Sequence, residues 1–206
     1  MIALADVAEH LLSWFQDHKR DLPFRWQGDP YKILIAGVLL RQTQALQVAA
    51  VYPRLIEIYD TPHLLALADE KDLKHILRPL GISSRARVLI EIAKAIVQKH
   101  DGVVPENYSD LIELPGIGDY IASCVLALGY KQSLPMVDVN VERVIGRLYG
   151  KECDIHQKYN EMCPRDQEEE FHYAVLDLAQ KICRHINPKC DLCPLGDKCK
   201  YHLGRF

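Results

Sequence analysis

The chain lacks the features of a membrane-spanning, secreted or disordered protein. Its 206 residues contain no apolar run close to the roughly 18 residues that a membrane span needs, the longest candidate being Ile33 to Leu40. A secretory signal is not expected, because Asp6 and Glu9 interrupt the apolar residues near the N-terminus and no basic segment precedes them. The 49% content of hydrophobic residues is ample for a core and unlike that of disordered or collagen-like chains. We therefore expect a soluble intracellular protein of one large domain or two small ones.

The chain also lacks the basic excess that is typical of nucleic-acid-binding domains. It has 25 Lys and Arg residues against 28 Asp and Glu residues, a formal net charge of -3. This balance at first argues against a nucleic-acid partner. However, the segment from Lys181 to the end holds six basic residues against two acidic ones, a net charge of +4, which leaves −7 for the first 180 residues. A basic terminus of this kind can hold phosphates, so the whole-chain charge does not exclude DNA.

A disulfide framework is not expected either, because seven cysteines are an odd number and no export signal accompanies them. Four cysteines are concentrated in the last 24 residues, separated by six, two and five residues: Cys183, Cys190, Cys193 and Cys199. Four thiolates this close together can form a metal site, and the candidates are a structural zinc ion and an iron–sulfur cluster. The spacing alone does not distinguish between them. The charged residues between the cysteines disfavour a third interpretation, in which the thiols are simply buried in the core.

Alternating strand patterns are absent, and the sequence has the periodicity of consecutive helices. Asp29-Pro30 is a helix start signal, because it places an N-cap residue before a proline at the first helical position. It predicts a buried helix from Tyr31 to about Val51, apolar nearly all round through Leu40. Further helices are predicted over 64–68, 73–77, 86–97, 109–114, 119–128, 139–149 and 168–183. The prediction is an all-α fold of about nine or ten helices.

A glycine-rich turn, Leu114-Pro115-Gly116-Ile117-Gly118, lies between two of the predicted helices. Its two glycines allow positive backbone dihedrals and leave no side chain over the turn, so backbone N–H groups can face a phosphate. Such a turn suits non-specific contact with the DNA backbone. An ordinary connection between two helices is equally compatible with the pattern.

A carboxylate, Asp138, stands at the predicted start of the helix 139–149. Capping of that helix is one explanation for an aspartate at this position. The other explanation is that the carboxylate projects from the helix end towards the glycine-rich turn, where it could stabilise positive charge developing on a sugar. Both explanations remain open on the sequence.

In combination and in this order, these motifs resemble the helix-hairpin-helix (HhH-GPD) DNA glycosylase superfamily, which contains endonuclease III and the MutY-type adenine glycosylases. The resemblance covers nearly the whole chain: Leu22-Pro23 to Trp26, Asp29 to Lys32, Leu39 to Gln44, the glycine-rich turn, Val137-Asp138 and the cysteine cluster. The cysteine spacing matches the 4Fe-4S loop of that family, which implies an iron–sulfur cluster rather than zinc. The implied fold is two helical lobes that flank a DNA-binding cleft. A six-helix barrel with the helix-hairpin-helix motif would span residues 22–130, and an iron–sulfur cluster domain would combine residues 1–21 with 131–206.

Departures from the family's pattern narrow the implied activity. Endonuclease III-like enzymes carry a lysine where this chain has Tyr120, and a phenol cannot form a Schiff base with the opened sugar, so AP-lyase activity should be lost. MutY-type enzymes carry a glutamate where this chain has Gly37, and they generally add a C-terminal domain, whereas this sequence ends at Phe206. Tyr120, Asp138 and the segment Leu80 to Ala86 resemble the thymine glycosylases that act on G:T and G:U mismatches. Those enzymes retain an acidic residue at the position of Gly37, so one departure remains.

The resemblance therefore implies a monofunctional DNA glycosylase that hydrolyses the N-glycosidic bond of a flipped thymine or uracil opposite guanine in double-stranded DNA. Asp138 would stabilise the oxocarbenium-like sugar and orient the attacking water, and Tyr120 would contact the extruded base or sugar. The implied DNA contacts are the gap-filling Gln42 with Arg41 beside it, the wedge residues Ile82 and Ser83, the turn residues Leu114, Gly116 and Gly118, and Lys198 and Lys200 of the basic terminus.

Other functions stay open at this point. One is an adenine glycosylase acting on A:8-oxoguanine or A:G mispairs, and another is a non-catalytic iron–sulfur module that binds DNA, against which Asp138 speaks. A plain zinc-stabilised helical protein is a third. For the glycosylase we expect a monomer without membrane association, located in the cytoplasm with the nucleoid.

Overall fold

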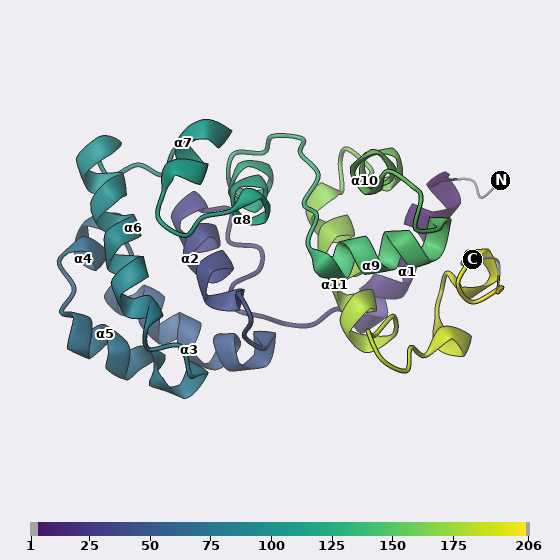
Figure 1. Cartoon of the computed structure of the whole chain (residues 1–206), viewed down its shortest axis with the longest axis horizontal. Coiled ribbons are helices and arrows are strands. Elements are labelled where there is room, and N and C mark those ends of the chain that lie inside the picture. The colour runs from purple at the N-terminus through teal and green to yellow at the C-terminus, as the bar shows by residue number, and fades with distance from the viewer. Residues whose placement is uncertain (1–3, 205–206) are drawn as a thin grey trace. The chain divides into compact units, whose positions relative to one another are not determined.

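The computed structural model describes residues 4–204, and every regular element in this range is helical. The prediction of an all-α fold is therefore confirmed. Within the described range, no helix is both long enough and apolar enough to cross a membrane. The chain divides into two compact units, one formed by Asp21–Gln132 and the other by Met1–Arg20 together with Ser133–Phe206. Figure 1 labels the helices of both units.

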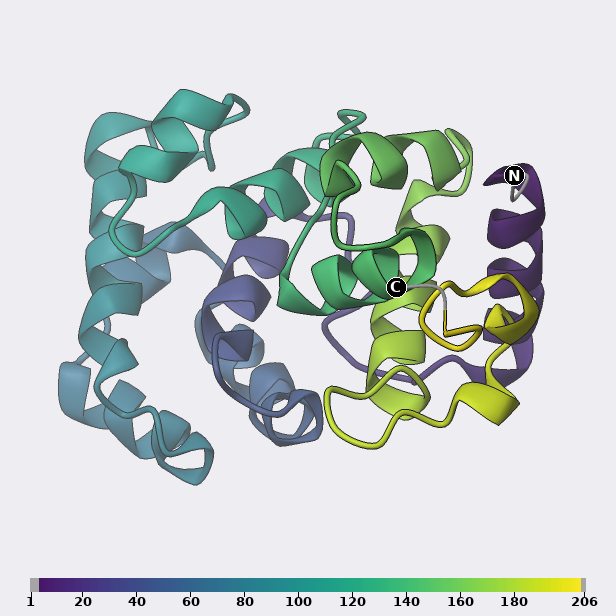
Figure 2. The same ribbon diagram turned by 45° about the vertical axis from the view of Figure 1, so that its right-hand side comes forward.

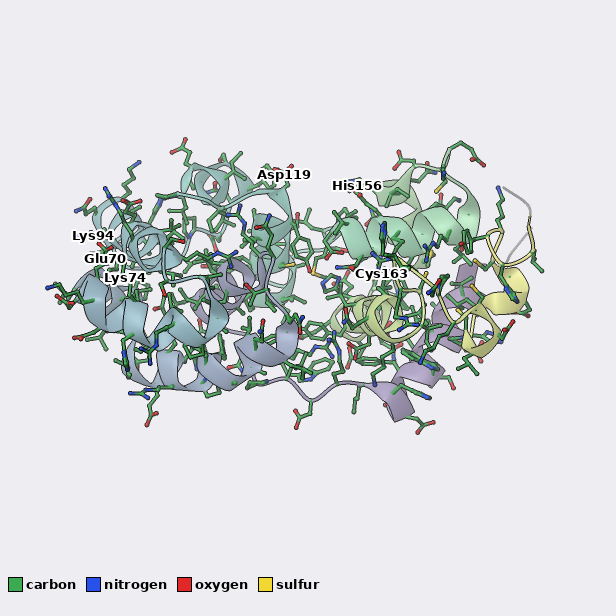
Figure 3. All side chains as sticks on the ribbon, turned by 60° about the horizontal axis from the view of Figure 1, so that its bottom comes forward. Glu70, Lys74, Lys94, Asp119, His156 and Cys163 are labelled. Carbon is green, nitrogen blue, oxygen red and sulfur yellow. The ribbon has the colours of Figure 1, made fainter. Side chains whose placement is uncertain are left out.

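The unit Asp21–Gln132 is built around the apolar helix α2. Its elements are α2 Pro30–Leu40, α3 Ala45–Ile58, α4 Pro62–Ala66, α5 Glu70–Leu77, η1 Arg78–Leu80, α6 Arg85–Lys99, α7 Tyr108–Glu113, α8 Asp119–Cys124 and η2 Val125–Gly129. α2 packs against α3, α8 and η2, which bury seven of its eleven residues. α6 packs against α4 and α5, and on α5 the exposed pair Glu70 and Lys74 forms an ion pair of 2.6 Å one turn apart (Figure 3).

The start of α2 confirms the predicted helix signal. Asp29 accepts hydrogen bonds from the backbone N–H groups of Tyr31 at 2.8 Å and Lys32 at 3.3 Å, and Pro30 occupies the first helical turn. An N-cap of this kind contributes about 1 kcal/mol to stability. The cap therefore fixes where the central helix begins.

The predicted end of this helix, at about Val51, is wrong. α2 ends at Leu40, and α3 begins at Ala45 after a turn in which Gln42 has a φ of +54°. No glycine or proline lies between these two helices, so the sequence gives no local signal for a break. The break is stabilised by a tertiary contact, because the guanidinium group of Arg85 donates hydrogen bonds to two carbonyl groups of the last turn of α2.

The second unit is discontinuous in sequence. It contains α1 Leu4–His18, α9 Val139–Tyr149, α10 Ile155–Met162, α11 Glu168–Lys181 and the short turns η3 Cys190–Leu192 and η4 Gly196–Lys198. α11 packs against α1 and α9, and α10 packs against the same two helices. The bounds of α9 agree with the prediction, whereas α10 lies outside the predicted helices because its exposed face is largely polar.

Specific contacts fasten the segments around Arg20 and Lys200 inside this unit. Asp177 of α11 is fully buried and accepts hydrogen bonds from the Nε atom of Arg20 at 2.6 Å and from its backbone N–H at 2.8 Å. The C-terminal segment returns to the end of α9, where the N–H groups of Lys200 and Tyr201 donate to backbone carbonyls of α9 at 3.1 and 3.0 Å (Figure 2). Breaking a buried ion pair on one side costs about 3–5 kcal/mol. The first 20 residues are therefore an integral part of this unit.

Candidate active site and nucleic-acid interface

The glycine-rich turn connects α7 to α8, and its two glycines do different things. Gly116 has a φ of +72°, and a Cβ there would lie 3.3 Å from a methyl carbon of Val88. Gly118 has an extended backbone with a φ of −114°, so only Gly116 uses the positive dihedral that a glycine allows. A Cβ at Gly118 would meet nothing within 4 Å, which leaves an open surface over the turn. Gly116 is therefore required by the turn, whereas Gly118 keeps the turn accessible from outside.

Two further contacts hold the turn together. Leu114 is only 3% exposed; its backbone N–H donates to the carbonyl of Leu111 on α7, and its own carbonyl accepts from the N–H of Ile117. Its side chain therefore packs inside the turn and helps to close it. The hydroxyl of Tyr108 on α7 donates a hydrogen bond of 2.7 Å to Asp119 on α8, and this bond raises the pKa of the Tyr108 phenol (Figure 3 labels Asp119). The two helices are thus linked across the turn.

A surface cavity of about 410 Å³ opens beside this turn. Its lining consists of Arg41 from the end of α2 and a continuous segment from Gly116 to Ile121. Tyr120 is partly buried in this lining. The structure thus brings together three residues that the sequence singled out separately: Arg41, Gly116 and Tyr120.

A larger cavity of about 590 Å³ lies elsewhere, in the discontinuous unit. It is lined by residues of α1 and of the segment from Glu161 to Gln167, including Cys163, and by none of the predicted site residues. We therefore locate the candidate chemistry at the smaller cavity, whose lining includes the predicted residues Arg41, Gly116, Gly118 and Tyr120.

The α2–α3 turn presents two predicted DNA contacts. Arg41 is exposed, and its Nη1 atom donates a hydrogen bond of 2.8 Å to the carbonyl oxygen of Gly116. Gln42 is also exposed, and its φ of +54° is a left-handed conformation that costs a non-glycine residue on the order of 1 kcal/mol. A strained, exposed glutamine held by its neighbours is typical of a functional position.

The other predicted wedge lies in the loop between η1 and α6. Ile82 and Ser83 are both partly exposed, so Ile82 is not a fully buried core residue. The carbonyl oxygen of Ile82 accepts a hydrogen bond of 2.8 Å from the N–H of Arg85, and the Ser83 hydroxyl donates one of 3.5 Å to the Lys74 carbonyl. Sequence reasoning missed Arg85. The available signal was its position, because a cation in the first turn of a helix opposes the helix dipole and needs another reason to be there.

Asp138 caps α9, as one of the two sequence interpretations expected. Its Oδ1 atom accepts hydrogen bonds from the backbone N–H groups of Asn140 and Val141, both at 2.9 Å, and its Oδ2 atom accepts one from the Asn140 side chain at 2.8 Å. The carboxylate remains partly exposed. Capping and a chemical role are compatible, because the three donors fix the carboxylate without covering it. Tyr120 and Asp138 belong to different units of the chain.

A chain of hydrogen bonds runs from Asp138 to the first cysteine of the cluster. The Asn140 side chain that donates to Asp138 accepts a bond of 3.0 Å from Arg143, whose Nε atom donates to the carbonyl oxygen of Cys183 at 2.9 Å. Arg147, one turn later on α9, donates to the Cys183 sulfur at 3.5 Å. α9 therefore contacts the predicted catalytic carboxylate at one end and the cysteine segment through its arginines. None of these polar partners was predicted from the sequence.

The four clustered cysteines are free and partly buried. Burial is the first cause that raises the pKa of Cys193, to about 11, and the charges of the other three thiols raise it further. The thiols therefore lie within electrostatic range of one another, beside the guanidinium group of Arg147. Among residues 4–204, no group of three or more His, Cys, Asp or Glu side chains is arranged to hold a single metal ion. Four thiols beside a cation suit the donor set of an anionic iron–sulfur cluster.

The two predicted lysines of the basic terminus differ in their surroundings. Lys200 forms an ion pair of 3.3 Å with Glu152, so part of its charge is already compensated within the protein. Lys198 lies in η4 and is partly buried. The positive charge available to a phosphate in this segment is therefore smaller than the sequence count indicates.

Comparison with known proteins identifies the family. The family model described as HhH-GPD superfamily base excision DNA repair protein matches residues 35–164. The chain belongs to this superfamily. The match includes the α2–α3 turn, the glycine-rich turn with Tyr120, and Asp138.

Relatives of this HhH-GPD chain include both thymine-DNA glycosylases and adenine DNA glycosylases. It is 39% identical to the thymine-DNA glycosylase of Aeropyrum pernix, an alignment that covers 95% of this chain and 94% of the relative. It is 36% identical to the adenine DNA glycosylase of Mycobacterium tuberculosis, over 95% of this chain and 67% of the relative. Among solved structures, that of a thermostable thymine-DNA glycosylase superposes with a TM-score of 0.91 at 27% identity, covering 98% of this chain and 97% of that one. Both classes share the fold, so the site must distinguish them.

Gly37 stands where the resemblance implied an acidic residue, and the structure shows what surrounds it. A Cβ at Gly37 would lie 3.0 Å from the Cγ2 atom of Ile121, which follows Tyr120 on α8. α2 and α8 therefore approach so closely that any longer side chain at this position would require Ile121 to move. Ile121 itself lines the cavity, so the lining beside Gly37 is apolar.

Proposed function

We propose that this protein is a monofunctional DNA glycosylase that removes thymine or uracil mispaired with guanine, acting as a monomer on double-stranded DNA of the nucleoid. The observation that supports this most directly is Tyr120 in the cavity beside the glycine-rich turn. The seven residues that line this cavity include no lysine, so no amine is available there for a covalent intermediate with the sugar. In such a site, water is the nucleophile that would displace the base.

In the proposed reaction, the protein anchors on one strand and rotates the mispaired base out of the duplex. The open surface over Gly118 would accept the phosphate backbone, and the exposed Gln42 would fill the space that the base leaves. Mispairing lowers the cost of unstacking, which supplies part of the selectivity. Because a pyrimidine leaves through N1 without prior protonation of a purine ring, the apolar pair Gly37 and Ile121 is compatible with this substrate.

The bond that breaks joins C1′ of the deoxyribose to the base, and the bonding electron pair departs with the base. Asp138 would stabilise the positive charge that develops on the sugar and orient the water that attacks C1′. Its three N–H donors hold the carboxylate in one orientation, which removes the cost of reorganising it during the reaction. Tyr120 would pack against the extruded base or sugar.

We also propose that Cys183, Cys190, Cys193 and Cys199 hold a 4Fe-4S cluster. When bound, the cluster would cross-link the C-terminal segment and thereby fix its position against α9. Arg147 would stabilise the charge of the bound cluster, because its guanidinium group lies against the Cys183 sulfur and donates to the carbonyls of Arg184 and His185 at 2.7 and 3.0 Å. Iron and sulfide analysis of freshly purified protein tests this assignment and distinguishes the cluster from zinc.

The test of the proposed function is single-turnover incubation with matched duplexes that contain G:T, G:U, A:8-oxoguanine or A:G, followed by alkaline cleavage of abasic sites. We expect base release from G:T and G:U, none from the adenine duplexes, and strand cleavage only after alkali. Asp138→Asn should abolish release while leaving binding intact, and full activity of this variant would contradict the mechanism.

Adenine removal is the second candidate function, supported by the 36% identity to an adenine DNA glycosylase. The close packing of Gly37 on Ile121 speaks against it, because no side chain at position 37 could protonate a purine. Release from the A:8-oxoguanine duplex alone would establish this function instead. Binding to all duplexes without any release would indicate a non-catalytic DNA-binding module.

A further inference from the structure

One arginine connects the two segments that are expected to enter the duplex. The guanidinium group of Arg85 donates hydrogen bonds to the carbonyl of Arg41, directly before Gln42, and to the hydroxyl of Thr43, directly after it. The same group donates to the carbonyls of Val38 and Leu39, both at 3.1 Å. The Arg85 side chain therefore holds both flanks of the exposed glutamine and the helix end from which it projects.

The backbone of the same residue holds the second segment. The N–H of Arg85 donates to the carbonyl of Ile82 at 2.8 Å, and the N–H of Ala86 donates to the carbonyl of Ser83 at 3.1 Å. α6 begins at Arg85, and Ser84 provides no side-chain cap. These two backbone hydrogen bonds therefore hold the loop against the first turn of the helix. Arg85 is thus bonded to the wedge loop through its main chain and to the glutamine turn through its side chain.

Favourable and unfavourable electrostatic effects both act on the contact between Arg85 and the end of α2. The carbonyls at the end of α2 have no partner within the helix and carry its negative dipole end, so a guanidinium group there is doubly favourable. Burial lowers the pKa of the Arg85 guanidinium group, and the neighbouring charge of Arg41 lowers it further. Both effects disfavour the charged form of Arg85 at this position. The contact thus forms on both sides of Gln42, whose backbone is left-handed, in spite of desolvation and like-charge repulsion.

We propose that Arg85 is a positioning residue for base flipping, which holds Gln42 and the Ile82–Ser83 loop at a fixed separation so that both segments enter the duplex together. This inference rests on the proposed function, because it concerns the step that extrudes the target base. Lysine cannot replace it, because a single ammonium group cannot bond to acceptors on both sides of Gln42 as a planar guanidinium fork does.

The experiment compares Arg85→Met and Arg85→Lys with the control Arg87→Met, whose residue lies on the same helix, is exposed, and forms an ion pair with Glu91 at 2.9 Å. Single-turnover excision is measured at saturating enzyme on a G:T duplex and on a duplex whose target uracil faces an abasic site. Both Arg85 variants should lose about tenfold in rate on G:T, as expected for charged hydrogen bonds. On the second duplex the loss should fall below about twofold, because an unpaired base needs less help to unstack. Equal losses on both duplexes, or none, would overturn the proposal.

A second measurement does not depend on catalysis. In Arg85→Met, hydrogen exchange should accelerate at the amides of Thr43 and Ala86, which are bonded to Leu40 and Ser83 in the two segments. The core helix α2 and the control Arg87→Met should keep the exchange rates of the wild type. If the wild-type protein released no base from any duplex, the proposed function would fail. The hydrogen-exchange measurement would still decide whether Arg85 holds the Gln42 turn and the Ile82–Ser83 loop together. Unchanged exchange at Thr43, or acceleration throughout α2, would rule the positioning role out.

Discussion

The guanidinium group of Arg41 donates a hydrogen bond of 2.8 Å to the carbonyl oxygen of Gly116, a residue 75 positions later in the chain. This bond joins the α2–α3 turn to the glycine-rich turn and places a cation in the lining of the cavity that contains Tyr120. Because Gly116 is the residue of the turn with the left-handed backbone, the contact fixes the peptide that follows it. Through Arg41 and Arg85, three segments that are distant in sequence thereby form one connected surface: the α2–α3 turn, the Ile82–Ser83 loop and the glycine-rich turn.

Replacing Arg41 with glutamine should weaken binding to a G:T duplex by about tenfold, because a charged hydrogen bond and a cation near phosphate are lost together. The matched control is Arg54→Gln, which removes the same charge from an exposed position on α3. Fluorescence anisotropy with labelled duplex measures both variants. Equal losses for Arg41→Gln and Arg54→Gln would show that only net charge matters.

Tyr120→Lys should introduce strand cleavage without alkali. The new amine would lie in the cavity beside the glycine-rich turn, where it could form a Schiff base with the opened sugar. Borohydride reduction during the reaction should trap a covalent protein–DNA complex from this variant, and none from the wild type or from Tyr120→Phe. If base release persisted and no complex were trapped, position 120 would not face the sugar.

Arg143→Gln should lower the single-turnover excision rate by about tenfold, since Asn140 loses the partner that orients it towards Asp138. Binding to an undamaged duplex should change little, because the residue belongs to the hydrogen-bond chain between Asp138 and Cys183. The control is Glu142→Gln, an exposed neighbour on the same helix. A comparable loss in that control would contradict the assignment.

Charge reversal at Lys198 and Lys200 should weaken DNA binding and flatten its dependence on salt, since fewer counterions would be released. The effect of Lys200→Glu alone should be the smaller one, because Glu152 already compensates part of its charge. Reversal of Lys94 and Lys99, exposed residues of α6, provides a control with the same change in net charge (Figure 3 labels Lys94). The slope of log affinity against log salt concentration is the measurement, and an equal change of slope in the control would contradict the local role.

Cys163 should resist alkylation. Burial, with a further contribution from Glu168, raises the pKa of its thiol to about 12, so the reactive thiolate is scarce at neutral pH (Figure 3). Against an ordinary thiol with a pKa of about 8.5, its thiolate fraction at pH 8 is lower by about a thousandfold. Iodoacetamide labelling followed by mass spectrometry should show a rate that rises with pH up to about 12. Rapid labelling at pH 8 would contradict the raised pKa of this thiol.

Much of the fold follows from local signals, and the exceptions have physical causes. Asp29-Pro30 and Asp138 mark the true starts of α2 and α9, since capping depends on a few neighbouring residues. The helix α10 was missed because its amphipathic pattern is short and mostly polar. The end of α2 could not be found from its own residues, because the hydrogen bonds that stabilise it come from Arg85 in another helix.

The residues of the candidate site also fall into those that local sequence reveals and those that it does not. Glycines, cysteines and a capping aspartate are recognisable by residue type and spacing, and so Gly116, Asp138 and the cysteine cluster could be singled out. The side chains that orient them, Arg85, Asn140, Arg143 and Arg147, act through contacts between segments that are distant in sequence. Residues of this kind follow no short motif, so only the folded arrangement reveals them.

Because the unit that contains α1 is discontinuous in sequence, the two units cannot fold at the same stage of synthesis. Every residue of the unit Asp21–Gln132 has been translated before α9 begins, so this unit can fold while the ribosome is still working. α1 meets its partner α11 only near the end of translation, when Asp177 becomes available to Arg20. A nascent chain stalled before α11 would therefore carry a folded unit Asp21–Gln132 and an N-terminal helix that lacks its partner α11, a form that protease accessibility of arrested ribosomes would reveal.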